Sequence, residues 1–136
     1  FEVKSFTKKS IYSWFRDTQS EFEKKDFFKI YIDYPRSRLI NRINIRAVKM
    51  IENGAIPEVR KFINLKVPRS NTASKAIGID EIRNYLNKKI TKLDVIEKIS
   101  IKTRQYAKRQ TTWGRGNMLD WNKIDSDALS KFLKKI

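Results

Sequence analysis

Only one stretch of the chain has the composition of a β-strand. This stretch, FFKIYIDY at residues 27–34, is rich in aromatic and β-branched residues and is followed by Pro35. A single strand cannot form a sheet, and its nearly continuous apolar character predicts burial on both faces. We therefore expect its neighbouring strands outside this chain, and we expect the chain itself to be mainly helical.

The region after the strand has the apolar spacing of a long helix. Ser37 is a candidate N-cap and Gly54 a stop signal, which predicts a helix that ends near Asn53. Arg38, Arg42 and Arg46 repeat every four residues on one face of this helix. Its predicted buried stripe lies on another face and consists of Leu39, Ile40, Ile43, Ala47, Met50 and Ile51.

Further helices are predicted on both sides of this region. Ser10 is expected to cap a short helix over residues 11–16, and two more helices are expected after Pro57 and over residues 80–87. A last amphipathic helix is predicted in the tail. Its apolar residues are Leu129, Phe132, Leu133 and Ile136.

The chain carries a large positive charge. Its 31 Lys and Arg against 15 Asp and Glu give a formal charge of +16. Such an excess is typical of proteins that bind a polyanion, so nucleic acid is the first expected partner and an anionic membrane surface a weak second. No apolar run approaches the roughly 20 residues that span a bilayer. We expect a cytoplasmic protein without a membrane role.

The segment TRQYAKRQTTWGR, residues 103–115, concentrates this charge, and no acidic residue occurs from residue 98 to residue 119. Thr91 and Asp94 have the spacing of a capping box and predict a helix through this segment, which Gly114 is expected to interrupt. Two interpretations are open. Tyr106 and Trp113 are core residues under solvated cations, or the segment binds phosphates and unstacked RNA bases.

The residue types for self-contained catalysis are missing. The chain has no His and no Cys, and therefore lacks the usual general base near neutral pH and any thiolate. Its four glycines form no GxxxxGK[ST] phosphate loop. Isolated carboxylates such as Asp33, Asp80 and Glu81 are expected to be strand-end, cap or surface charges. The residues alone indicate one basic helical domain without its own active site.

The basic segment resembles the signature TRxxAKRQxTWxR of the tRNA dimethylallyltransferase family. The stretches INRINIRAVKMIENGAIPEVRKFI and SKAIGIDEIRNYLNKKIT also match the family in order and approximate spacing, and the likeness extends back to FEVKSFTKKSI. The resemblance implies the C-terminal part of an α/β P-loop-type fold with a helical insertion. Residues 1–26 would end the insertion, residues 27–118 would belong to the catalytic core, and residues 119–136 would form a tail helix.

The resemblance also implies an activity. Members of the family transfer a dimethylallyl group from dimethylallyl diphosphate to N6 of the adenosine 3′ of the anticodon, and they flip this base out of the loop. The implied partners are the tRNA anticodon stem-loop, dimethylallyl diphosphate and Mg²⁺, and we expect a monomer. The family's phosphate loop, general-base Asp and most Mg²⁺ contacts precede the region that matches Phe1. We therefore expect no prenyl transfer by this chain alone.

Site residues follow from the resemblance by position. Arg46 matches the arginine that contacts the donor's diphosphate, while KAIGID and KRQTTWGR match tRNA-contacting segments. Trp113 is expected to be a core residue that supports Arg109 and Arg115. The expected tRNA-binding residues are Lys75, Ala76, Ile77, Gly78, Ile79, Asp80, Arg104, Lys108, Arg109, Gln110, Thr111, Thr112, Trp113, Gly114 and Arg115.

Some positions depart from the family pattern. Ile79 and Asp80 stand where an aromatic residue and a cation are usual, Gly114 replaces a bulkier residue, and Lys8 stands where glycine is common. These departures affect predicted RNA contacts but leave the resemblance intact. A function of another class stays open beside it, namely a stand-alone basic module that binds RNA or DNA without catalysis.

Overall fold

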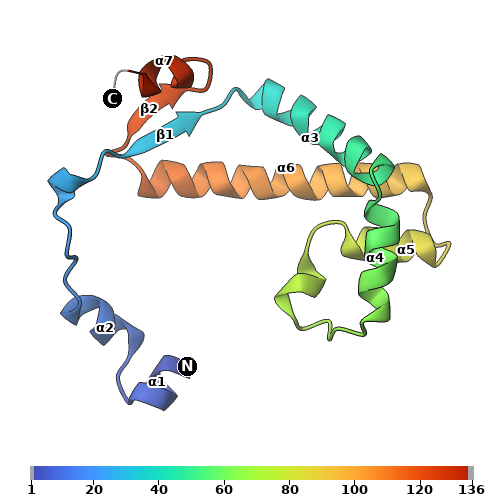
Figure 1. Ribbon diagram of the computed structural model, residues 1–136, viewed down its shortest axis with the longest axis horizontal. Helices are drawn as coiled ribbons and strands as arrows, with labels where there is room; N and C mark the ends of the chain where they lie inside the picture. The colour runs from blue at the N-terminus through green and yellow to red at the C-terminus, as the bar shows by residue number, and fades with distance from the viewer. Residues whose placement is uncertain (1, 135–136) are drawn as a thin grey trace. The chain divides into compact units, whose positions relative to one another are not determined.

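The computed structural model describes residues 2–134 and is mainly helical, as the sequence predicts (Figure 1). It divides into two units, one that ends at Ile30 and one that begins at Tyr31. Ile136, expected in the apolar stripe of the tail, lies outside the described residues. The expected division at residues 26 and 118 stays a prediction.

The elements of the chain follow one another with short connections. The first unit contains α1 (Glu2–Thr7), α2 (Ile11–Asp17) and the short 3-10 helix η1 (Lys24–Asp26). Strand β1 (Ile30–Asp33) follows at the boundary. The second unit continues with α3 (Arg36–Glu52), α4 (Ala55–Asn64), η2 (Thr72–Lys75), α5 (Ile79–Leu86), α6 (Lys92–Asn117), β2 (Asn122–Asp125) and α7 (Leu129–Leu133).

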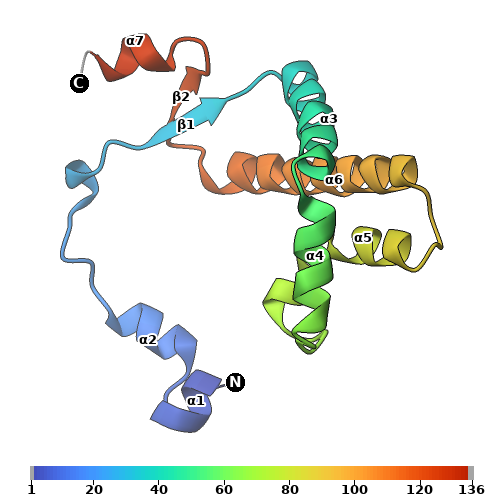
Figure 2. The same ribbon diagram turned by 45° about the vertical axis from the view of Figure 1, so that its right-hand side comes forward.

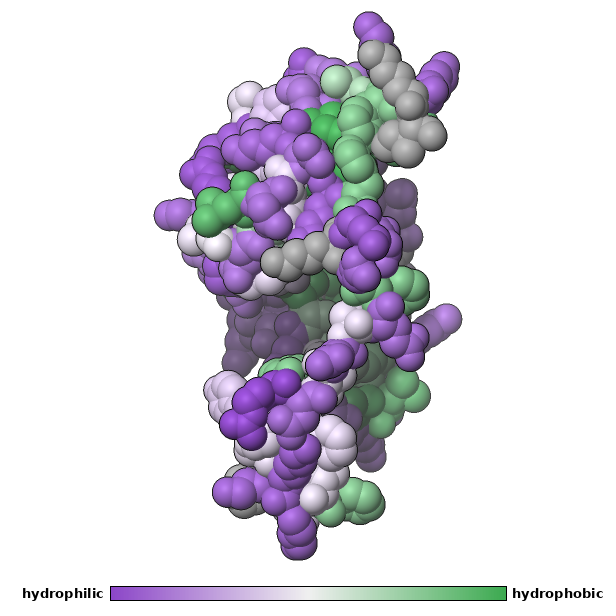
Figure 3. Space-filling model, turned by 90° about the vertical axis from the view of Figure 1, so that its left-hand side faces the viewer, coloured by the Kyte–Doolittle hydropathy of each residue, from purple (hydrophilic) through white to green (hydrophobic). Residues whose placement is uncertain are grey.

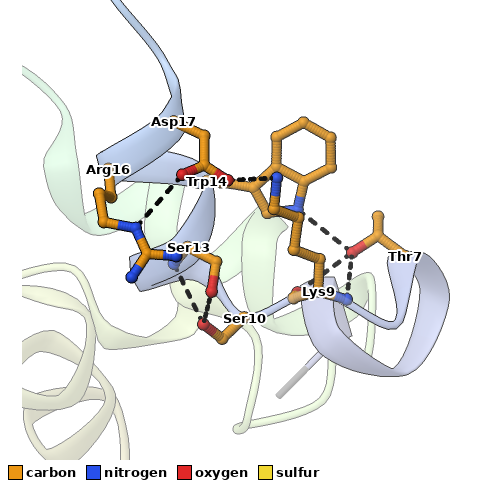
Figure 4. Close-up of polar contacts among 7 residues, drawn as sticks. All are labelled: Thr7, Lys9, Ser10, Ser13, Trp14, Arg16 and Asp17. Carbon is orange, nitrogen blue, oxygen red and sulfur yellow. Dashed lines mark hydrogen bonds and ion pairs between the residues drawn. The ribbon is translucent and has the colours of Figure 1, made fainter.

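The first unit is held by local polar contacts (Figure 4). Ser10 caps α2 as predicted, since its hydroxyl accepts a hydrogen bond of 3.1 Å from the backbone N–H of Ser13. Trp14 Nε1 donates to Thr7 Oγ1 at 3.3 Å, and Lys9 Nζ lies 2.6 Å from a carboxylate oxygen of Asp17. No residue of α2 is buried, so this unit has no apolar core of its own among its described residues.

Helix α3 buries the predicted stripe. Ile43, Ala47 and Ile51 are buried, and Leu39, Ile40 and Met50 are half-buried. The predicted N-cap at Ser37 is wrong, because the helix begins at Arg36 and Pro35 occupies the cap position. The fixed φ of proline suits this position, and the Pro35 carbonyl accepts a 3.0 Å hydrogen bond from Leu39 N–H.

The core of the second unit lies where α3, α4, α5 and α6 meet. Figures 1 and 2 both show α3 crossing α6, with α4 and α5 beside the N-terminal half of α6. Ile82 and Val95 are each only 1% exposed, and burying a side chain of this size contributes about 1.5–3 kcal/mol. The core cluster consists of Ala47, Ile51, Ala55, Val59, Ile82, Val95 and Ile99.

Helix α6 begins as predicted but runs further. Thr91 and Asp94 form the expected capping box, with hydrogen bonds of 3.2 and 2.7 Å between side chain and backbone. The predicted interruption at Gly114 is wrong, because α6 continues to Asn117. A Cβ on Gly114 would lie 2.8 Å from Cε2 of Tyr31, so this glycine permits a close approach of β1 rather than ending the helix.

The sheet contains a strand that the sequence analysis missed. β1 is shorter than predicted and pairs with β2, which runs in the same direction (Figure 1). Just beyond the end of β2, Ser126 N–H donates a 3.0 Å hydrogen bond to the carbonyl of Asp33, the last residue of β1. The expected burial of β1 on both faces by strands outside this chain stays a prediction; within the chain, Ile32 is 48% exposed and the described strands number two. A neighbouring strand therefore exists within the chain itself.

The face drawn in Figure 3 is mostly hydrophilic, with separate hydrophobic patches between the charged residues. Among residues 2–134, no helix has the length and apolar character needed to cross a membrane.

Candidate nucleic-acid interface

The predicted tRNA-binding residues 75–80 lead from η2 into the first turn of α5. Gly78 is buried and has a φ of 108°, a left-handed conformation that favours glycine. A Cβ at this position would lie 3.6 Å from side-chain atoms of both Met50 and Ile99, so the backbone here rests directly on α3 and α6. Lys75, Ala76 and Ile77 are exposed beside it.

Two of the residues that depart from the family pattern, Ile79 and Asp80, lie at the start of α5. Ile79 is half-buried and packs against the core cluster. Asp80 is exposed, and one of its carboxylate oxygens lies 2.7 Å from Nη1 of Arg83. Neither side chain adds positive charge to residues 75–80, where Lys75 supplies the cation.

Glu81, one of the carboxylates expected to be a cap or surface charge, is a buried cap at the start of α5. Its Oε2 accepts a 3.0 Å hydrogen bond from Gly78 N–H, and its Oε1 pairs with Nζ of Lys102 on α6. Burial raises the pKa of Glu81, but the hydrogen bond from Lys102, the backbone N–H groups of Glu81 and Gly78 and the Lys102 charge together outweigh it, so the net pKa is lowered. The capping-box spacing of Gly78 and Glu81 was the available sequence signal.

Three basic residues of α6 share one face. At 100° per residue, Arg104, Lys108 and Arg115 lie within roughly 40° of one another, and because α6 runs unbroken through Gly114 this alignment is kept. We call these three residues the cationic face of α6. Lys108 and Arg115 are exposed and Arg104 is half-buried. Among the described residues, none of the three has an acidic side chain within ion-pairing distance.

The aromatic residues of this segment are exposed, so the prediction that Trp113 is a core residue is wrong for this chain. Tyr106 is 50% and Trp113 59% exposed. The less exposed side of this segment carries smaller residues, with Gly114 buried and Ala107 and Thr111 half-buried. Arg109 extends over the Tyr106 ring, with its guanidinium carbon 5.7 Å from the ring centroid. The other selected side chains of this segment, Gln110 and Thr112, are exposed as well.

The three arginines of α3 have different surroundings. Arg38 Nη1 contacts both carboxylate oxygens of Asp127 at 2.8 and 2.6 Å, and this hydrogen-bonded pair raises the pKa of the guanidinium. Arg42 lies 6.0 Å from the centroid of the Tyr34 ring. Arg46 is exposed, and no ion pair or hydrogen bond of its side chain occurs among the described residues. Of the three, Arg46 is therefore the one whose guanidinium group has no partner among the described residues.

This arrangement is suited to binding anions. Exposed guanidinium and ammonium groups bind phosphates through charge-assisted hydrogen bonds. Within residues 2–134, no group of three acidic or other metal-binding side chains is close enough to hold a metal ion.

Comparisons with known proteins agree with the predicted resemblance. The family model described as IPP transferase matches residues 1–117. A tRNA dimethylallyltransferase of Pelagibacter ubique (strain HTCC1062) is 48% identical over 136 residues, which cover 100% of this chain and 44% of that protein. A tRNA dimethylallyltransferase of Wolbachia pipientis wMel is 40% identical over 125 residues, which cover 91% and 41%.

Two solved structures have the same fold over this region. The tRNA isopentenylpyrophosphate transferase of Bacillus halodurans superposes with a TM-score of 0.66 at 31% identity, over 84% of this chain and 36% of that one. A tRNA isopentenylpyrophosphate transferase of Staphylococcus epidermidis superposes with a TM-score of 0.68 at 27% identity, over 99% and 46%. The chain spans less than half the length of each of these relatives. On the family match and these identities, the chain belongs to the IPP transferase family.

Proposed function

We propose that this chain supplies tRNA-binding surface to a tRNA dimethylallyltransferase. The observation that carries the proposal is the cationic face of α6, which has no acidic partner among the described residues of a chain in this family. Unpaired cations on a rigid helix neutralise phosphates and release counterions, and this gives affinity without sequence specificity. Specificity for the anticodon loop then requires further contacts, for which the exposed Tyr106, Trp113 and residues 75–80 are available.

The proposed reaction transfers a dimethylallyl group from dimethylallyl diphosphate to an adenosine next to the anticodon. The bond between C1 of the donor and its diphosphate oxygen breaks, a bond forms between C1 and N6 of the adenine, and N6 loses a proton. The role proposed for Arg46 is to bind the departing diphosphate, whose negative charge grows as the C–O bond breaks. This role is supported by the exposure of Arg46 and by the lack of a partner for its guanidinium group among the described residues.

Binding of RNA tests the first part of the proposal. The affinity of the chain for an anticodon stem-loop with adenosines 3′ of the anticodon is compared with that for a scrambled stem-loop over a series of salt concentrations. We expect log Kd to rise steeply with log salt, by about 0.9 for each phosphate neutralised in a duplex, and we expect the adenosine-bearing loop to bind more tightly. Absence of salt-dependent binding to either RNA would refute the proposal.

A chimera tests the catalytic part. The matching 44% of the Pelagibacter ubique relative is replaced by this chain, and transfer of labelled dimethylallyl to tRNA is measured. We expect activity in the chimera, none in this chain alone, and a loss of about 100-fold or more in the chimera with Arg46→Gln. A stand-alone binding module also predicts RNA binding by this chain, but it predicts that the chimera is folded and inactive.

A further inference from the structure

Glu81 is buried in an unusual way for a carboxylate. It is 4% exposed, although it lies in the first turn of a helix in a protein with many exposed charges. A buried charge is stable only when it is paired and hydrogen-bonded. Both oxygens of Glu81 meet this condition, and each does so with a different part of the chain.

One partner of Glu81 lies within residues 75–80, and the other lies on α6, the helix that carries the second set of proposed RNA contacts. Oε2 accepts the hydrogen bond of 3.0 Å from Gly78 N–H, and Gly78 lies within residues 75–80. Oε1 pairs with Lys102 on α6, and at 100° per residue Tyr106, Arg109 and Trp113 lie within about 40° of Lys102. One side chain therefore connects the backbone of residues 75–80 with the side of α6 that carries these three residues, and the cationic face points away from it.

Apolar packing fixes the same junction. Ile99 precedes Lys102 by about one helical turn, and its side chain lies 3.6 Å from the position that a Cβ on Gly78 would occupy. Met50 of α3 contacts this position at the same distance. Residues 75–80 are thus held against α6 by an ion pair and by apolar contacts on the same side of the helix.

We infer that Glu81 and Lys102 form a positioning pair, which holds residues 75–80 in register with Tyr106, Arg109 and Trp113 on the same side of α6, so that the two segments bind one RNA together. The inference rests on the proposed function. RNA that contacts both segments needs a fixed distance between them, and a rigid connection avoids ordering them at the moment of binding. Neither Glu81 nor Lys102 needs to touch the RNA for this purpose.

Electrostatics and positioning predict opposite effects for Glu81→Gln. The substitution removes a negative charge from a basic protein, and electrostatics alone would strengthen RNA binding. Loss of the positioning pair would weaken it instead. We expect the affinity for the anticodon stem-loop to fall by about 5–50-fold, within the usual range of coupling between sites. Amide hydrogen exchange without RNA should become faster at Gly78 and across residues 75–80.

Lys102→Met provides the second variant, because it leaves the Glu81 cap on Gly78 available. We expect weaker stem-loop binding of similar size, faster exchange at Gly78, and near-normal behaviour in the conservative Lys102→Arg. The Glu81→Gln, Lys102→Met double variant should bind no more weakly than the weaker single variant. Lys98→Met is the matched control, since it removes the same charge from the same exposed helix, and we expect its affinity to change by no more than about threefold.

The outcomes separate the inference from the proposed function. If the unaltered chain fails to bind the stem-loop, the proposed function fails. If the unaltered chain binds but Glu81→Gln binds equally well or more tightly while it remains folded, Glu81 has no positioning role and the inference is wrong. Unchanged exchange at Gly78 in Lys102→Met would also overturn it, because the pair would then not hold the segment.

Discussion

At Gly114, two effects of a single methyl group oppose each other. Replacing glycine by alanine in an exposed helix adds about 1 kcal/mol of stability, because alanine loses less backbone entropy on folding. At this position, however, the new Cβ would lie 2.8 Å from Cε2 of Tyr31. Overpacking of this kind costs about 1–3 kcal/mol, so the steric effect should dominate.

Gly116 is the matched control, because it lies on the same helix and a Cβ there would meet no atom within 4 Å. We expect Gly114→Ala to lower the free energy of unfolding and Gly116→Ala to raise it by up to about 1 kcal/mol. Urea unfolding followed by circular dichroism measures both changes. Equal stabilisation by the two substitutions would mean that the Tyr31 ring moves away without cost.

The cations of the molecule should differ in their contribution to RNA binding. Lys108 is exposed on the cationic face of α6, whereas Arg38 is engaged with Asp127 at 2.6 Å. We expect Lys108→Gln to reduce the slope of log Kd against log salt by about 1 and Arg38→Gln to leave it nearly unchanged. Fluorescence anisotropy with the anticodon stem-loop provides the measurement. A larger effect of Arg38→Gln would contradict the proposed location of the RNA.

At the scale of the elements, the junction of α5 with α6 should weaken in acid. The folded-state pKa of Glu81 lies below its ordinary value of 4.5, because the contacts with Lys102 and the backbone N–H groups outweigh burial. The stabilisation by ionised Glu81 is therefore complete above about pH 4.5 and is lost as the pH falls through the folded-state pKa. Asp94, whose pKa is lowered by hydrogen bonds from the Thr91 side chain and backbone, adds a loss of the same sign below its ordinary value of 3.8.

Urea midpoints between pH 6 and pH 3 measure this dependence. We expect the midpoint to fall with decreasing pH in the unaltered chain, and Glu81→Gln to be less stable at pH 6 with a shallower decline. Asp94→Asn should also lower the stability at pH 6, because the capping box loses its carboxylate. A decline of the same steepness in Glu81→Gln would show that Glu81 is not the group that titrates.

Local sequence signals predicted the elements well where they depend on local interactions. The cap at Ser10, the capping box at Thr91 and the stop signal at Gly54 all coincide with observed helix ends. The signals failed where tertiary contacts decide. Gly114 lies within α6 and leaves room for the Tyr31 ring, a tertiary contact that the local sequence does not indicate. β2 lacks a strand signature because only Ile124 of its four residues is buried.

At the scale of the whole molecule, the two units should differ in their contribution to stability. Every residue of the core cluster belongs to the second unit, whereas large apolar residues of the first unit are exposed, including Phe6 at 93%. We expect a chain from which residues 1–29 are removed to unfold at nearly the same urea concentration as the unaltered chain. Loss of cooperative unfolding in the shorter chain would show that the first unit stabilises the core.

The candidate interface was predictable from the sequence only in part. The absence of acidic residues around residues 104–115 was visible directly, and the structure adds that Arg104, Lys108 and Arg115 share a face. The pairing of Arg38 with Asp127 joins residues 89 positions apart, and no local pattern indicates it. The exposure of Trp113 was mispredicted for a similar reason, because the choice between neighbouring faces of α6 depends on what α3 and β1 cover.

The unbroken course of α6 also constrains where the sequence can change in length. Ile99 packs in the core cluster, Gly114 contacts Tyr31, and the cationic face lies on the same continuous helix. One inserted or deleted residue between positions 99 and 114 would turn everything beyond it by about 100° and separate these contacts. Insertions and deletions among homologues should therefore be confined to the connections, such as residues 66–71 and 118–121, while the spacing within α6 stays fixed.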